Sequence, residues 1–326
     1  MGKLEIIEGI TILVSNNVIG DKQAENRFKG FRGELFLENY ITEKYPFYKQ
    51  LEGGIIISKN STDTSLDNSI YITIIPKENL DEDYKNIYCS LAKLGFEKMF
   101  LVAYTNANWT KTPVMFFENE TIQLWVPEME IYEFKTESGN FKTTSNTTTV
   151  ITSLFNSVEK RGKNIFPIEQ STTDMFTENM IQFSEIQLLK IYMNRLFLDG
   201  LIGFGKEKGK LSDIDQILKR PSGEFKLIEI KEKDLPKKAT KGFGLDVPRL
   251  KDMIRITTET KLEYHLVIRE INNQTDRKLV GWKHIKIRDF ANNVNWEEEI
   301  KGGTGMRSLN TYNPTLICPY RLFNDL

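Results

Sequence analysis

Residues 210–234 read KLSDIDQILKRPSGEFKLIEIKEKD, and this stretch decides how the rest of the chain is interpreted. It contains two short runs in which polar and apolar residues alternate, 211–218 and 225–231. Between them lies Pro221-Ser222-Gly223. Alternation with a period of two is typical of β-strands, and proline and glycine between two such runs favour a turn. The stretch therefore predicts a β-hairpin.

Two or three carboxylates and one ammonium of this hairpin are expected to meet in one place if the register brings the charged faces of the two strands together. Side chains alternate across a strand, so Asp213 and Asp215 share one face of the first strand. Glu229 and Lys231 share one face of the second strand for the same reason. Isoleucine and leucine occupy most of the remaining strand positions, which indicates a half-buried sheet. Burying charge is costly unless it is compensated, so these four residues require a functional reason.

A divalent metal ion is the simplest compensation. Mg²⁺ prefers hard oxygen ligands and is usually held by one or two carboxylates together with water and phosphate oxygens. We expect Asp215 and Glu229 to be metal ligands and the carbonyl of Ile230 to be a third. Lys231 would then lie beside a water molecule at the metal, where it orients the nucleophile or stabilises charge on a phosphate. The pattern indicates metal-assisted hydrolysis of a phosphodiester.

The order of elements around the hairpin supports a family resemblance. An Asp in one strand and Glu-x-Lys in the next, followed by a basic amphipathic helix, resembles the PD-(D/E)XK nuclease superfamily, which includes most type II restriction endonucleases. The resemblance covers about residues 178 to 290, with helices expected over 184–197 and 246–257 and a strand over 262–268.

The resemblance assigns roles residue by residue. The first Asp of the pattern is followed by apolar residues, which gives its role to Asp215, with Asp213 as the second choice. Glu229 and Lys231 match the Glu and Lys of the pattern directly, although no proline precedes the Asp. Glu185, on the helix before the hairpin, is expected to add a contact at or near the metal. The implied fold class is α/β (α+β), with a mixed-sheet PD-(D/E)XK core flanked by helices and preceded by a separate N-terminal α/β domain.

The function implied by the resemblance is a Mg²⁺-dependent endonuclease, with Mn²⁺ as a substitute, that acts on double-stranded DNA and leaves a 5′-phosphate. A sequence-specific type II restriction enzyme of a restriction-modification system is the first expectation. It would act as a homodimer, because one site cuts one strand and a palindromic site calls for two-fold symmetry. A cognate methyltransferase is expected as a functional companion and not as a bound subunit.

Other interpretations remain open from the sequence. A defence effector nuclease that is activated by a ligand, or a structure-specific resolvase, would use the same catalytic core. From a different class, the chain could be a non-catalytic DNA-binding subunit that keeps the nuclease scaffold. The simplest alternative is that the charged residues form the solvated face of an edge strand.

The N-terminal half repeats the same order of elements. We expect a helix over 26–45, strands over 54–58 and 69–75, a helix over 81–94 and a strand over 98–104. This order indicates either an internal duplication or the common succession of elements in α/β proteins. In a duplication, Ile75-Pro76-Lys77 would take the place of Glu229-Ile230-Lys231 and would lack a metal ligand.

These observations predict three parts of the chain. Residues 1–135 are expected to form an N-terminal domain for DNA recognition or dimerisation. Residues 136–165, rich in Thr, Ser, Asn and Gly at their start, are expected to be a linker. Residues 166–326 would form the catalytic domain.

Basic residues are densest directly after the hairpin. Arginine and lysine both suit phosphate oxygens, and an arginine at the start of a helix is well placed to reach them. Arg249 is therefore the best single candidate for a contact with the DNA backbone. The full set of predicted DNA-binding residues is Lys233, Lys237, Lys238, Lys241, Arg249, Arg255 and, in a glycine-rich loop, Arg307.

Composition excludes several other classes. The chain has 326 residues and a formal net charge of −1, which neither favours nor excludes DNA, because a local basic surface is enough. The two cysteines, Cys89 and Cys318, have no ligand spacing, which argues against a disulfide framework or a cysteine zinc site. The two histidines, His265 and His284, have no neighbouring ligand residues. No long apolar run or leader is present, so we expect no membrane partner and a cytoplasmic protein.

Overall fold

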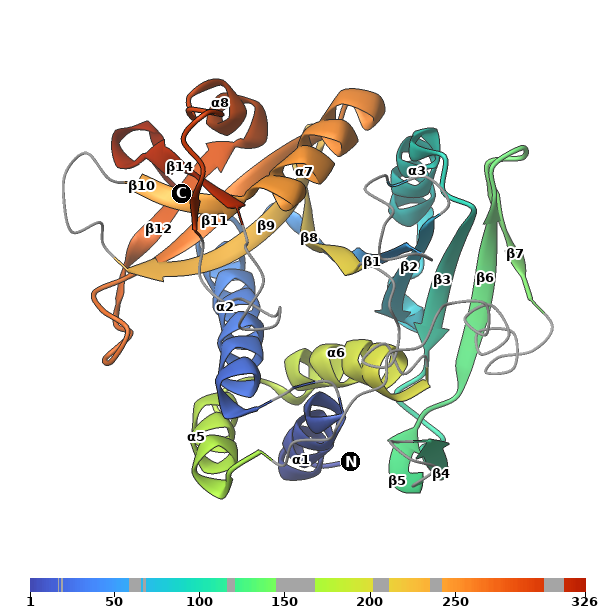
Figure 1. Cartoon of the computed structure of the whole chain (residues 1–326). Helices are drawn as coiled ribbons and strands as arrows, with labels where there is room; N and C mark the ends of the chain where they lie inside the picture. The colour runs from blue at the N-terminus through green and yellow to red at the C-terminus, as the bar shows by residue number, and fades with distance from the viewer. Residues whose placement is uncertain are drawn as a thin grey trace. The chain divides into compact units, whose positions relative to one another are not determined.

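The structure, a computed structural model, describes residues 1–16, 18, 20–58, 66, 69–115, 121–144, 168–201, 211–234, 242–301 and 314–326. Contacts divide the chain into two compact units (Figure 1). Unit 1 comprises residues 1–32 and 54–211, and unit 2 comprises residues 33–53 and 212–326. Both units combine helices with a mixed sheet, which confirms the predicted α/β class. Neither unit is one continuous piece of sequence, because residues 33–53 belong to unit 2 and residues 168–201 belong to unit 1.

Unit 1 contains a mixed sheet with the strand order β1-β2-β3-β6-β7 and a separate β4-β5 hairpin. Strands β2 and β3 are parallel, and the other neighbours in the sheet are antiparallel. Its elements are α1 (Lys3–Ser15), the first part of α2 (Asp21–Lys44), the second part of β1 (Lys49–Ser58), β2 (Ser69–Pro76), α3 (Glu82–Leu91), β3 (Lys98–Tyr104), β4 (Thr110–Met115), β5 (Thr121–Val126), β6 (Met129–Lys135), β7 (Asn140–Thr143), α5 (Gln170–Met180) and α6 (Glu185–Arg195). Strand β7 pairs with β6 inside the segment predicted as a linker, so the start of that segment is a hairpin.

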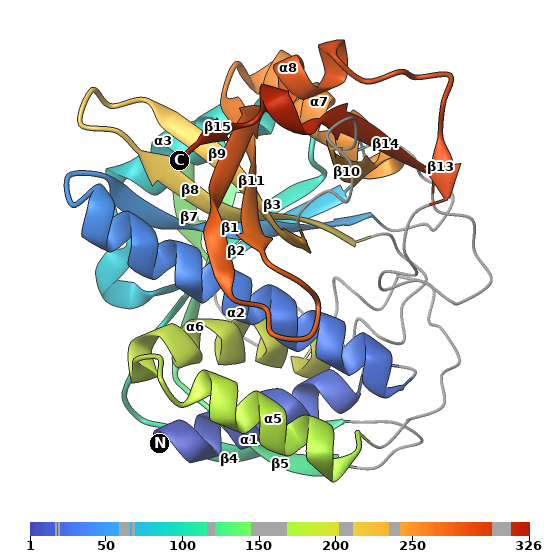
Figure 2. The same ribbon diagram turned by 90° about the vertical axis from the view of Figure 1, so that its left-hand side faces the viewer.

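Helices α1, α5 and α6 lie side by side in unit 1 (Figure 2). A Cβ atom at Gly9 of α1 would lie 2.4 Å from the ring of Tyr192 on α6, so the two helices approach closely at this glycine. Ser184 caps α6 as predicted: the Gln187 backbone N–H donates to the Ser184 hydroxyl oxygen at 3.2 Å. In return, the Ser184 N–H donates to the Gln187 side-chain oxygen at 3.1 Å.

Unit 2 contains a mixed sheet with the strand order β15-β12-β11-β9-β8-β1, in which β9 and β11 are parallel. A smaller sheet has the order β10-β14-β13. The elements are the second part of α2, the first part of β1, β8 (Leu211–Lys219), β9 (Phe225–Asp234), β10 (Gly242–Asp246), α7 (Val247–Thr260), β11 (Glu263–Ile271), β12 (Leu279–Lys286), α8 (Ile287–Asn292), β13 (Ile300–Lys301), β14 (Pro314–Pro319) and β15 (Asn324–Asp325).

The predicted hairpin is confirmed as β8 and β9, which pair from Gln216 with Ile228 to Lys219 with Phe225. The turn closes through a hydrogen bond from the Gly223 N–H to the Arg220 carbonyl at 2.9 Å. Gly223 has φ of 92°, a conformation that glycine adopts without steric cost. The proline and glycine between the two alternating runs therefore identify this turn correctly.

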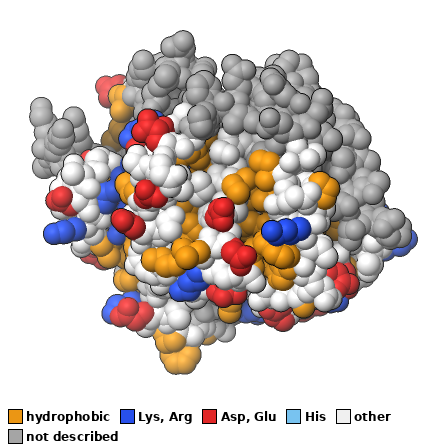
Figure 3. Space-filling view, turned by 90° about the horizontal axis from the view of Figure 1, so that it is seen from below, with side chains coloured by type: hydrophobic (Ala, Val, Ile, Leu, Met, Phe, Trp, Pro, Cys, Tyr) orange, Lys and Arg blue, Asp and Glu red, His pale blue; other side chains and the backbone are white. Residues whose placement is uncertain are grey.

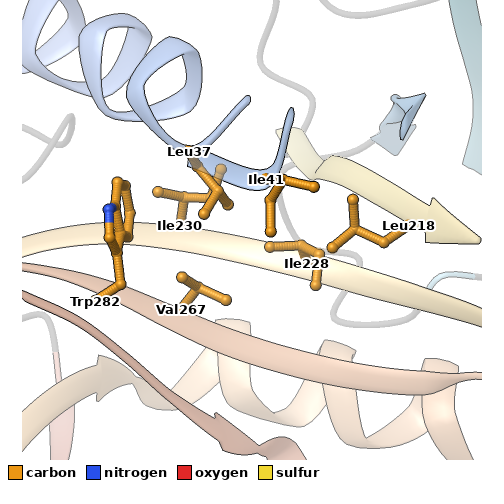
Figure 4. Packing of buried hydrophobic residues seen from close by; sticks show 7 residues of the cluster. All are labelled: Leu37, Ile41, Leu218, Ile228, Ile230, Val267 and Trp282. Carbon is orange, nitrogen blue, oxygen red and sulfur yellow. The ribbon is translucent and has the colours of Figure 1, made fainter. Parts of the chain in front are cut away.

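The two faces of the unit 2 sheet have different chemistry. Helix α2 covers one face with an apolar cluster, and α7 lies against the other face (Figures 1 and 2). Figure 4 shows the apolar cluster, which consists of Leu37, Ile41, Leu218, Ile228, Ile230, Val267 and Trp282. Because side chains alternate along β9, Ile228 and Ile230 face α2, and Glu229 and Lys231 point to the side of α7. Glu229 and Lys231 therefore lie on the face of the sheet that α7 covers.

Within the described residues, no helix combines the length and the apolar character needed to cross a membrane.

Candidate metal-binding site

The candidate site lies where β8 separates from β9. The regular ladder between the strands ends at Gln216 and Ile228, and the next contact uses a side chain. The Ile230 N–H donates to Asp215 Oδ2 at 2.6 Å, which fixes this carboxylate against β9. On the other side of β8, a Cβ atom at Gly53 of β1 would lie 1.7 Å from the Ile214 carbonyl oxygen, so the close approach of β1 requires glycine.

Three carboxylates meet at this point, as the sequence predicts. One oxygen from each of Asp213, Asp215 and Glu229 lies within 4.8 Å of the other two. Asp213 is 51% exposed and Glu229 only 1% exposed, so the cluster reaches from the protein interior to solvent. The solvated-face interpretation is therefore wrong for Glu229, whose side chain is enclosed by the fold.

Lys231 lies beside this cluster and is accessible to solvent. Its Nζ lies 2.7 Å from Glu229 Oε1, and its side chain is 39% exposed. Burial alone would lower the pKa of Lys231, but the Glu229 and Asp215 carboxylates outweigh this effect and raise the pKa above its usual range. Lys231 is therefore charged at neutral pH and acts as a hydrogen-bond donor.

Arg249, in the first turn of α7, places a second cation in the cluster. Its Nε lies 3.1 Å from Glu229 Oε2, and its Nη2 also donates to that oxygen and lies 3.2 Å from Asp213 Oδ1. The guanidinium further donates to the Ser212 hydroxyl and to the Asp213 carbonyl. The Tyr264 hydroxyl, 3.5 Å from Nη2, completes the surroundings. Arg249, predicted to contact DNA, therefore binds the acidic cluster in this structure.

The carboxylates differ in how their charge is compensated. Burial by itself would raise the pKa of Glu229, but Arg249 and Lys231 outweigh it and lower the pKa to about 2. Burial, and after it the charges of Glu229 and Asp213, raise the pKa of Asp215 well above its ordinary value. A divalent cation would relieve the repulsion at Asp215. The cluster offers three hard oxygen donors, and the negative charge of one of them, Asp215, is not fully compensated by nearby cations. This combination fits Mg²⁺ or Mn²⁺.

A fourth carboxylate, Glu34 of α2, contributes to the negative field at Asp215 and was missed by the sequence reasoning. The adjacent Gly33 lies against β9, where an added Cβ would be 3.9 Å from Ile230 Cγ2. A glycine inside a helix pattern, here Gly33, is the signal that could draw attention to this segment. Glu185, the predicted helical carboxylate, begins α6 in unit 1 and is exposed.

The predicted DNA-binding residues have varied surroundings. Lys233 is half-buried, and burial and then the charge of Lys231 lower its pKa. Arg255 pairs with Glu259 of the same helix, with Nε and Oε1 2.6 Å apart. The others, Lys237, Lys238, Lys241 and Arg307, lie outside the described residues. On the face seen in Figure 3, described lysines and arginines are interspersed with acidic residues and do not gather in one basic patch.

Comparisons with models of known protein families, with curated protein sequences and with solved structures give no match for this chain. The function must therefore be argued from the geometry of the site.

Proposed function

We propose that this protein is a Mg²⁺-dependent endonuclease that hydrolyses phosphodiester bonds in double-stranded DNA. The observation that carries the proposal is the convergence of Asp213, Asp215 and Glu229 beside the solvent-accessible ammonium of Lys231. Carboxylates on adjacent strands can hold a divalent metal, and a lysine ammonium beside them can stabilise charge that develops on a phosphate.

Each residue has a defined part in this proposal. Asp215 and Glu229 hold the metal, with Asp213 as a further ligand at the exposed side and the Ile230 carbonyl as a proposed ligand. A bound Mg²⁺ supplies charge stabilisation at the phosphate and lowers the pKa of water. Lys231 is held by Glu229 in its charged form, so its ammonium orients the attacking water and donates to a phosphate oxygen as negative charge develops there.

The finer function follows from the family resemblance. We propose a sequence-specific type II restriction enzyme that acts as a homodimer, because cutting both strands of a palindrome uses two sites related by two-fold symmetry. In this proposal unit 1, whose sheet has no corresponding acidic cluster among its described residues, supplies recognition or dimer contacts.

The test is cleavage of unmethylated duplex DNA of phage length in the presence of Mg²⁺. Wild type is compared with Lys231→Met and with Lys226→Met, which removes a lysine from the same strand outside the cluster. We expect discrete fragments from wild type and Lys226→Met. Lys231→Met should cleave at least about a hundredfold more slowly, because a donor to developing charge is lost.

Discrete fragments with 5′-phosphate ends would support the restriction enzyme. Cleavage without reproducible ends would retain the nuclease and reject sequence specificity. Equal cleavage by wild type and Lys231→Met would show that this cluster is not the catalytic site. Absence of cleavage with Mg²⁺ and with Mn²⁺ would reject an autonomous nuclease and favour an activator-dependent effector or a binding subunit.

A further inference from the structure

Arg249 binds the same carboxylates that the proposed metal needs. Its guanidinium contacts Glu229 Oε2 through two nitrogens and Asp213 Oδ1 through one. Lys231 occupies the other oxygen of Glu229. Both oxygens of the most buried carboxylate are therefore already paired with side-chain cations.

The surroundings of the guanidinium form a socket built from three strands. Ser212 and Asp213 come from β8, Glu229 from β9 and Tyr264 from β11. All of these groups present oxygen atoms, and the Arg249 side chain is only 12% exposed. A socket of oxygen acceptors around one cation is also suited to another cation.

We propose that Arg249 is an internal competitor of the divalent metal, and that the metal binds by displacing its guanidinium from Glu229 and Asp213. This inference rests on the proposed function, because it assigns the regulation of the same site. A guanidinium and a divalent ion on the same carboxylate oxygens repel each other, most strongly at Glu229, whose side chain is only 1% exposed. The two cations therefore exclude each other at Glu229 and Asp213.

The displaced arginine gains a new task. A planar guanidinium binds phosphate oxygens through two parallel hydrogen bonds, and it starts from the first turn of α7 beside the metal ligands. DNA offers the phosphate that compensates the freed charge. Metal binding and DNA binding are thereby coupled, since each favours the displaced position of Arg249.

The experiment is a titration of the full-length protein with Mn²⁺ in the absence of DNA, with free Mn²⁺ measured by electron paramagnetic resonance. Arg249→Gln removes the competing charge, and Arg249→Lys keeps a charge but loses the planar fork. Arg220→Gln is the matched control, because it removes an arginine from the turn of the same hairpin, where Arg220 pairs with Glu224. Circular dichroism verifies that each variant is folded.

We expect Arg249→Gln to bind Mn²⁺ on the order of tenfold or more tightly than wild type, since a like charge at this range changes cation affinity by at least one logarithmic unit. Arg249→Lys should lie between the two, and it carries the same test if Arg249→Gln does not fold. Arg220→Gln should bind within about twofold of wild type because its charge is screened by solvent.

Unchanged or weaker binding by the Arg249 variants, with clear binding by wild type, would overturn the inference alone. Arg249 would then only hold the carboxylates in position. The proposed nuclease activity would not be affected by this result, because the cleavage assay tests it separately. Absence of Mn²⁺ binding in wild type and in all variants would overturn the inference and the metal premise of the proposed function together.

Discussion

The β8-β9 hairpin of unit 2 and the β1-β2 hairpin of unit 1 have the same topology and opposite chemistry. In unit 2, β8 and β9 are antiparallel, α7 follows, and β11 returns parallel to β9. In unit 1, β1 and β2 are antiparallel, α3 follows, and β3 returns parallel to β2. In each case the next strand of the sheet, β12 or β6, is antiparallel. The repeated order seen in the sequence therefore extends to the direction of every strand pair.

The ladders identify which residues correspond. The parallel ladder starts at Lys226 in β9 and at Ile70 in β2, so Glu229 corresponds to Thr73 and Lys231 to Ile75. One step beyond the antiparallel ladders, Asp215 corresponds to Gly54. The sequence alone predicts that Ile75-Pro76-Lys77 corresponds to Glu229-Ile230-Lys231. The ladders instead align the motif with Thr73 to Ile75, two residues earlier in β2.

Unit 1 shows that this topology does not need buried charge. Its counterpart positions carry buried Thr73 and Ile75, next to the buried Tyr71 and Tyr88. Replacing buried ion pairs by packed apolar groups is often neutral or stabilising, so charge at the same ladder positions in unit 2 is not explained by stability. The contrast between the two hairpins is therefore an argument that the unit 2 cluster is functional.

The largest expected effect is on the rate of DNA cleavage, which should depend on the unit 2 hairpin and not on the unit 1 hairpin. Asp215→Asn should reduce cleavage at least a thousandfold, equivalent to about 4 kcal/mol in the barrier, because it removes a proposed metal ligand. It should not lower the thermal midpoint, since its surroundings already disfavour the charged form of Asp215. Thr73→Val, at the position in unit 1 that faces Gly54, should leave cleavage unchanged. A fully active Asp215→Asn would remove this carboxylate from the proposed site.

A slightly smaller effect concerns stability. Glu229→Gln should lower the free energy of unfolding by about 3 to 4 kcal/mol, because Arg249 and Lys231 lose their shared buried partner. Thr73→Val should change it by less than about 1 kcal/mol. Urea unfolding at pH 7 measures both differences. Equal effects of the two substitutions would mean that the cluster is not a coupled ionic network.

Much of the fold follows from local patterns in the sequence. The hairpin, α7 and β3 were predicted to within a few residues, because alternation, turn residues and helical spacing are local signals. The assignment of helices to sheets could not be predicted in this way. The second part of α2 precedes the unit 1 hairpin yet packs in unit 2, and α6 precedes the unit 2 hairpin yet belongs to unit 1. Apolar spacing defines a buried face and does not specify which sheet covers it.

The residues of the candidate site also fall into those that local sequence patterns predict and those that depend on how helices pack on sheets. Asp213, Asp215, Glu229 and Lys231 share one hairpin, so the alternation of side chains was enough to bring them together. Glu34 lies on the part of α2 that belongs to unit 2, and no local pattern in the sequence indicates this. The sequence therefore points to Glu185, on the helix directly before the hairpin, as the helical carboxylate. The ion pairs of Arg249 depend on the distance between α7 and β9, which spacing along the chain does not determine.

The smallest expected effect concerns a neighbouring position in the same ladders, where His265 of β11 corresponds to Phe100 of β3. His265 is buried, and burial, followed by the charge of Lys226, lowers its pKa to about 4, with Glu263 opposing the shift through a hydrogen bond and His284 adding to it. An unfolded histidine takes up its proton near pH 6.5, before the folded one. Folding stability from this residue is therefore complete above about pH 6.5 and is lost as the pH falls towards 4, by at most about 3 kcal/mol.

His265→Phe, which copies the unit 1 residue, should remove this part of the acid sensitivity, measured as the difference in unfolding free energy between pH 7 and pH 4.5. The reciprocal Phe100→His should introduce acid sensitivity into unit 1, since burial penalises the charged imidazole there as well. Identical pH profiles for wild type and His265→Phe would show that His265 is not held neutral by the fold. Burial would then not control the protonation of His265. The two ladders would share their strand order, but the corresponding positions His265 and Phe100 would not share the same environment.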